Sequence, residues 1–205
     1  MKYIESRLRV VPTSLLISIL LWAFLLWGIV LTPSISLAQS TDQYKIPRIS
    51  ERPQIDGEVG IAEWASALRV DVNIETDPGN NVAAAVTTEA MLMEDGEVLY
   101  VAFIAKDDNI SDLRAFLRDR DTTGRDDRVG IVLDTFNDER RAYEFYVNPY
   151  GVQSDIVYDD VNQRGDGSWN AIWDSAGQIG DDQYSVELAI PLKQLRFSPG
   201  EGLQT

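Results

Sequence analysis

The stretch TTEAMLMEDGEVLYVAFIA (residues 87–105) contains two apolar runs separated by a polar turn. TTEAMLM (87–93) and VLYVAFIA (98–105) flank EDGE (94–97), in which aspartate precedes glycine. This dipeptide is typical of a tight β-hairpin turn. VLYVAFIA is apolar at every position, so both faces of that strand should be covered. The stretch therefore predicts a hairpin whose second strand lies at the centre of a sheet.

Two further strands are predicted at RVGIVLDTF (128–136) and RRAYEFYV (140–147), joined by a polar turn. In the second, Tyr143, Phe145 and Val147 share one face, because successive side chains of a strand alternate. Glu144 and Tyr146 share the other face.

The run QYSVELAI (183–190) alternates in the same way. Its inward positions are Tyr184, Val186, Leu188 and Ile190. Ser185 and Glu187 are expected to point outward. Many short strands, with turn signals about every ten residues and almost no helical periodicity, predict an all-β fold. We expect an antiparallel, jelly-roll-like β-sandwich, with a closed barrel as the alternative.

The N-terminus has the three-part layout of a secretory signal peptide. Lys2, Arg7 and Arg9 precede an apolar run (15–31), and Ala38 ends a stretch of small residues. We expect a signal peptide at 1–38 and one domain at 39–205; a retained membrane anchor is the alternative, since the run is nearly long enough to span a bilayer. Either arrangement implies export to the periplasm, outer membrane or extracellular space.

The composition excludes several classes of function. The net charge is −15, which disfavours nucleic acid as a partner. The chain has no histidine and no cysteine, so the usual ligands of zinc and haem and the commonest general base are missing. We expect no zinc, no haem and no enzymatic activity.

Four motifs, in this order, resemble family-nine carbohydrate-binding modules. They are IDGEVGIAEWASA (55–67), VLYVAFIAKDD (98–108), RDDRVGIVLDTF (125–136) and YSVELAIPLKQL (184–195). The stretches at 134–155 and 168–175 are also similar to the N-terminal domain of large bacterial envelope proteins that continue into a predicted outer-membrane barrel.

The resemblance implies a non-catalytic sandwich that binds a glycan and accompanies glycoside hydrolases in polysaccharide catabolism. Two positions depart from the family's sugar site, because Gly124 and Gly130 stand where its sugar-binding members carry a tryptophan and a carboxylate. The alternative is therefore a structural or partner-docking domain of an envelope protein whose sugar site is lost. The comparison also suggests a domain truncated at its C-terminus, with a barrel or another envelope partner missing.

Trp169 and Trp173 in GSWNAIWDS are the proposed sugar-stacking platform, since aromatic faces bind the apolar face of a pyranose. In an extended strand both rings point to one side together with Ala171, and Ile172 points back to anchor the segment. The polar partners expected nearby are Tyr158, Asp155 and Arg164. The alternative is that one or both indoles close the end of the sandwich.

Acidic residues in RDRDTTGRDD (118–127) suggest a structural calcium site, because calcium prefers several converging carboxylate and carbonyl oxygens. The candidate ligands are Asp119, Asp121, Asp126 and Asp127. An EF-hand loop that begins at Asp119 is excluded, because Gly130 stands at its twelfth position, where the bidentate glutamate ligand is required. The alternative is a solvated loop balanced by its arginines. Trp64 is expected in the core.

Overall fold

The computed structural model describes residues 44–76 and 79–197. The chain divides into two compact units, Met1–Asp42 and Gln43–Thr205, and only the second is described. The predicted signal peptide thus lies outside the described residues. Among those residues, no helix is long and apolar enough to span a membrane.

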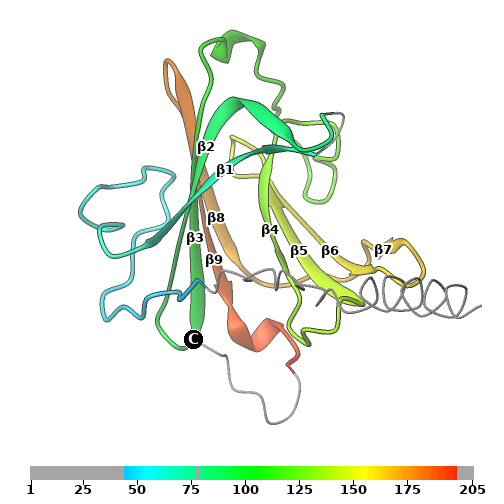
Figure 1. Cartoon of the computed structure of the whole chain (residues 1–205). Coiled ribbons are helices and arrows are strands. Elements are labelled where there is room, and N and C mark those ends of the chain that lie inside the picture. Colours follow the sequence, from blue (N-terminus) through cyan, green and yellow to red (C-terminus); the bar gives the residue numbers. More distant parts are fainter. Residues whose placement is uncertain (1–43, 77–78, 198–205) are drawn as a thin grey trace, which may run out of the picture. The chain divides into compact units, whose positions relative to one another are not determined.

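The domain is a sandwich of two antiparallel sheets (Figure 1), which confirms the predicted fold. The five-stranded sheet has the order β1 (Leu68–Glu75), β2 (Val82–Glu94), β3 (Val98–Lys106), β9 (Gln183–Pro191), β8 (Asp174–Ile179). The four-stranded sheet has the order β4 (Val129–Leu133), β5 (Arg141–Val147), β6 (Gln153–Asp159), β7 (Arg164–Asp166). The described residues also contain two single-turn 3-10 helices, η1 (Ile110–Asp112) and η2 (Leu192–Gln194).

The hairpin of β2 and β3 forms as predicted, with Glu94 paired to Leu99 across the turn. Gly96 adopts a φ of 91°, a conformation that glycine tolerates and other residues rarely adopt. Asp95 stabilises the turn because its Oδ1 accepts hydrogen bonds of 2.8 Å from the backbone N–H groups of Glu97 and Val98.

β3 lies at the centre of the five-stranded sheet and is covered on both faces, as predicted. Val101 and Phe103 belong to the core cluster that also contains Phe145 of the opposite sheet. Tyr100 and Ala102 belong to a second cluster on the other face. Residues of the segment 44–67 cover that face, where Ile49, Ile55, Val59 and the fully buried Trp64 pack.

The expectation that Ser185 and Glu187 point to solvent is wrong. Both are buried on the face of β9 that the N-terminal segment covers, and Glu187 is 0% exposed. The Ser185 hydroxyl donates to the carbonyl oxygen of Gly57 at 2.6 Å. Polar residues at alternate positions predict a solvent-exposed face only where no other segment packs on that face. Here the segment 44–67 packs on it.

Candidate functional site

A cleft of about 940 Å³ lies at one end of the four-stranded sheet. Its lining includes Arg141, Tyr143, Asp159, Asn162, Arg164, Asp166, Trp169 and Arg196. In the strand register, Arg141 lies opposite Asp159, and Asp159 lies opposite Arg164. These three side chains therefore share one face across β5, β6 and β7. Because Tyr143 and Phe145 share that same face and pack into the core, the cleft is an opening on the inner side of the sheet.

Trp169 forms an aromatic wall of this cleft and is only partly buried. Its ring centroid lies 5.0 Å from that of Tyr143, with an interplanar angle of 50°, and 5.8 Å from that of Phe145, with an angle of 75°. Such tilted and edge contacts fix an aromatic ring while leaving part of its surface accessible.

Trp173 does not lie in the cleft, and the predicted two-ring platform is wrong. The side chain is 4% exposed and packs edge-on against Phe145, with centroids 5.3 Å apart. Trp169, Ala171 and Trp173 do all turn toward the protein, as the two-residue period predicted, and it is the core that they meet. Ile172, the predicted anchor, is 79% exposed on the opposite side.

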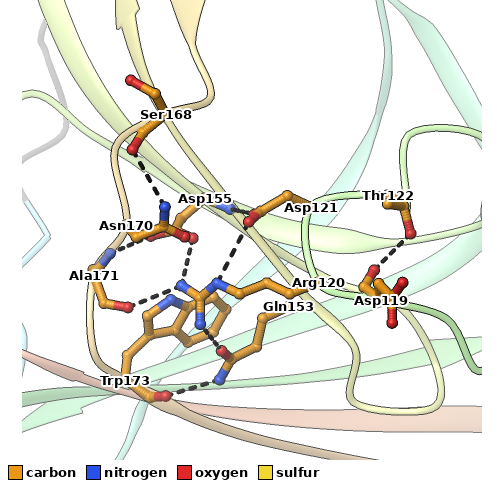
Figure 2. A network of polar contacts seen from close by, with 10 residues as sticks. All are labelled: Asp119, Arg120, Asp121, Thr122, Gln153, Asp155, Ser168, Asn170, Ala171 and Trp173. Carbon is orange, nitrogen blue, oxygen red and sulfur yellow. Dashed lines mark hydrogen bonds and ion pairs between the residues drawn. The ribbon is translucent and has the colours of Figure 1, made fainter.

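Asp155 holds the segment 169–173 to β6 and is not an exposed sugar contact (Figure 2). Its side chain is fully buried. Oδ2 accepts a 2.6 Å hydrogen bond from the N–H of Ala171, and Oδ1 pairs with Nη2 of Arg120 at 2.5 Å. The same Nη2 donates to the Ala171 carbonyl oxygen at 2.9 Å.

Gln153 extends this network by one residue. Its Nε2 donates to the carbonyl oxygen of Trp173 at 2.8 Å, and its Oε1 accepts a hydrogen bond from Arg120 (Figure 2). The guanidinium of Arg120 also lies 5.8 Å from the Trp173 ring centroid. The network fixes the segment 169–173, which forms no strand pairing of its own. The sequence patterns did not predict this structural role for Arg120 or Gln153.

The structure separates the remaining two predicted contacts. Arg164 lines the cleft. Tyr158 lies on the opposite face of the sheet, paired with Ala142 and Gly165, and its hydroxyl donates to Gln163 at 3.2 Å. Side chains of adjacent strand positions alternate, so a face that includes Asp159 excludes Tyr158.

The two carboxylates of the cleft, Asp159 and Asp166, accept hydrogen bonds from residues two or three positions further along the chain. The side chain and then the backbone N–H of Asn162 donate to Asp159 and lower its pKa. The hydroxyl and then the N–H of Ser168 act in the same way on Asp166. Both groups are therefore ionised at neutral pH and already hold hydrogen-bond donors.

The four aspartates proposed for calcium do not converge. Within 44–76 and 79–197, no group of three or more metal-ligating side chains is gathered. Their partners differ: Asp126 pairs with Arg118 at 2.9 Å and accepts from Asn148, Asp127 accepts from the N–H of Arg114, and Asp121 from the N–H of Asp155. Asp119 uses its backbone carbonyl oxygen to accept from Thr122. These residues fold the loop on itself, so calcium binding stays a prediction without a site in this part of the chain.

The space that a side chain at position 130 would need is occupied by Tyr146 and by the backbone of Phe145. A Cβ added there would lie 2.4 Å from Cδ1 of Tyr146 and 2.5 Å from the carbonyl oxygen of Phe145. The guanidinium of Arg128 stacks over Tyr146 at 4.1 Å from the ring centroid. The outer face of the sheet therefore has a tyrosine ring where the resemblance placed a carboxylate. At Gly124 an added Cβ would meet nothing within 4 Å.

The fold and the motifs define a β-sandwich of the carbohydrate-binding-module class. The family model described as "Carbohydrate family 9 binding domain-like" matches residues 55–204, and the chain belongs to this family. A comparison with curated proteins returns no match.

Solved structures with the same fold include a putative carbohydrate-binding protein from Bacteroides uniformis, with 12% identity and a TM-score of 0.58 over 73% of this chain and 72% of that one. A family 9 module from Caldicellulosiruptor kristjanssonii in complex with glucose is 22% identical, with a TM-score of 0.49 over 72% and 67% of the two chains. A family 9 module from the same organism in complex with cellotriose is 21% identical, with a TM-score of 0.46 over 71% of this chain and 65% of that one.

Proposed function

We propose that this protein is a non-catalytic glycan-binding module and that the sugar binds in the cleft beside Trp169. The observation that supports this most is a partly exposed indole in a polar cleft of suitable size, in a member of a carbohydrate-binding family. Ligand sites typically have volumes of about 300–1,000 Å³ and combine apolar walls with a few polar groups. The indole face would stack on a sugar ring, and Asn162 and Arg164 would bond its hydroxyls.

The cleft does not provide the groups that glycoside hydrolysis needs. A hydrolase requires one carboxyl group that keeps its proton, with a raised pKa, and a second that is ionised. The pKa values of both Asp159 and Asp166 are lowered. The chain also has no histidine to replace the acid. Binding without cleavage is the function that these groups support.

The setting of this activity follows from the leader pattern and the family. An exported module of this kind would hold a polysaccharide close to glycoside hydrolases in the periplasm, at the outer membrane or outside the cell. The basic residues at the start of the chain and the apolar run at 15–31 support export.

Affinity electrophoresis against a panel of glycans tests the proposal. Trp169→Ala should abolish retardation of the migrating protein by the retained glycan. Ile172→Ala is the matched control, because that side chain lies in the same segment and points away from the core. Equal retardation of the two variants would contradict binding at Trp169.

A second candidate is a structural or docking domain of an envelope protein, whose partner is a barrel domain or another envelope component. The filled position at Gly130 favours it, because Tyr146 and Arg128 occupy the place of the family's carboxylate. No retardation on any glycan would favour this role over sugar binding.

A further inference from the structure

The cleft is rich in arginine, although the chain as a whole is acidic. Arg141, Arg164 and Arg196 line it, against two carboxylates, Asp159 and Asp166. The cleft thus has a local charge of +1 in a chain whose net charge is −15. A surface this acidic repels polyanions, so an anion that binds must be held by a specific local arrangement.

The arginines of the cleft are more available than its carboxylates. Asp159 and Asp166 accept bonds from Asn162 and Ser168, as described above. The contact of Arg141 with Asp159 is long, at 4.0 Å. Within the described part of the chain, the guanidinium groups of Arg164 and Arg196 make no hydrogen bond or ion pair.

The three arginines line the same cleft as the indole of Trp169. Arg141 and Arg164 flank Asp159 in a row across the sheet. Arg196 follows η2 and also lines the cleft, and its backbone N–H donates a hydrogen bond to the Tyr143 hydroxyl oxygen at 3.3 Å. Guanidinium is planar and matches a carboxylate with two parallel N–H donors. An indole beside such donors suits a ring that has one apolar face and one carboxylate.

We propose that the cleft selects acidic glycans, and that the unit it takes is a uronic acid. Its ring stacks on Trp169 while its carboxylate pairs with Arg164 and Arg196. This inference rests on the proposed glycan-binding function and adds the class of sugar. Because exposed ion pairs are weak individually, the two arginines together should contribute roughly a tenfold gain in affinity.

The experiment uses the full chain and measures electrophoretic retardation by polygalacturonate, alginate, neutral xylan and dextran sulfate. Arg164→Gln/Arg196→Gln removes two cleft charges. Arg69→Gln/Arg125→Gln removes the same charge from exposed positions outside the cleft and serves as the control. Melting temperatures confirm that each variant is folded.

The inference predicts retention on polygalacturonate or alginate that falls about tenfold in the cleft variant, is unchanged in the control, and is lost in Trp169→Ala. Equal retention on xylan, with no effect of the cleft arginines, overturns the inference and leaves glycan binding intact. Stronger retention on dextran sulfate, or acidic binding that survives Trp169→Ala, shows unspecific ion exchange and also overturns it. No retention on any glycan overturns both proposals.

Discussion

The indole Nε1 of Trp64 donates a 2.9 Å hydrogen bond to Oε1 of Glu187, which lies 123 positions further along the chain. The second carboxylate oxygen accepts from the N–H groups of Gly57, at 2.8 Å, and Asp56, at 3.0 Å. The opening motif with Trp64 and the closing Glu-x-x-Ile-Pro motif are therefore two halves of one contact. A buried carboxylate that accepts three N–H groups fastens the N-terminal segment to the sheet.

Replacing Glu187 by glutamine should destabilise the domain by about 1–3 kcal/mol, because one N–H donor then faces the amide NH₂ and is left unpaired. Glu97→Gln is the control: Glu97 is exposed, its ion pair with Arg52 contributes little, and a change within about 0.5 kcal/mol is expected. Urea unfolding measures both. Equal stabilities would show that the carboxylate contributes nothing specific.

The stability that depends on Glu187 should decrease as the pH rises. Burial raises the pKa of this carboxyl above its ordinary value of 4.5, so the folded state favours its protonated form. Its contribution is present below pH 4.5 and is lost as the pH rises through the raised pKa. The free energy of unfolding of the wild type, minus that of Glu187→Gln, should fall as the pH rises above 4.5 and through the raised pKa. A difference that grows with pH would contradict the direction of the shift.

Trp173→Ala should cost about 3–5 kcal/mol, since it empties a core position that packs against Phe145. Trp169→Ala removes a partly exposed ring and should lower the melting temperature less. Thermal unfolding of the two variants provides the comparison. A melting temperature of Trp173→Ala at or above that of Trp169→Ala would place the first ring outside the core.

Gly130→Ala should destabilise the domain by about 1–3 kcal/mol, because the added methyl group meets the Tyr146 ring and the Phe145 carbonyl oxygen. Gly124→Ala is the matched control, since its added methyl group meets nothing, and it should change stability by no more than about 0.5 kcal/mol. Chemical denaturation of both measures the difference. If Gly130→Ala is as stable as the control, Tyr146 leaves this position free for a side chain.

The sheet architecture could be predicted because it depends on local signals. The Asp95-Gly96 turn fixed the β2–β3 hairpin, and the apolar run 98–105 indicated a strand covered on both faces. The buried state of Glu187 could not be read in the same way. It depends on a segment more than one hundred residues away, and a single strand's alternation does not show which segment covers it.

The candidate site was predicted in part, for the same reason. Trp169 and Arg164 lie in one cleft, whereas Asp155 and Trp173 lie in the core and Tyr158 lies on the other face. The two-residue period of a strand predicted which side chains share a face. It did not predict whether that face is exposed to solvent or packs against the opposite sheet.

The proposed location of the sugar is tested most directly by ¹H–¹⁵N spectra of the indole and backbone N–H groups during titration with the glycan that retards the protein most. Trp169→Phe identifies the Trp169 signal. Binding in the cleft predicts that this signal moves on titration, while that of Trp64, bonded to Glu187 beneath the N-terminal segment, stays in place. A stationary Trp169 signal, with shifts centred on Tyr146 and Arg128, would contradict binding in the cleft and place the sugar on the outer face of the sheet.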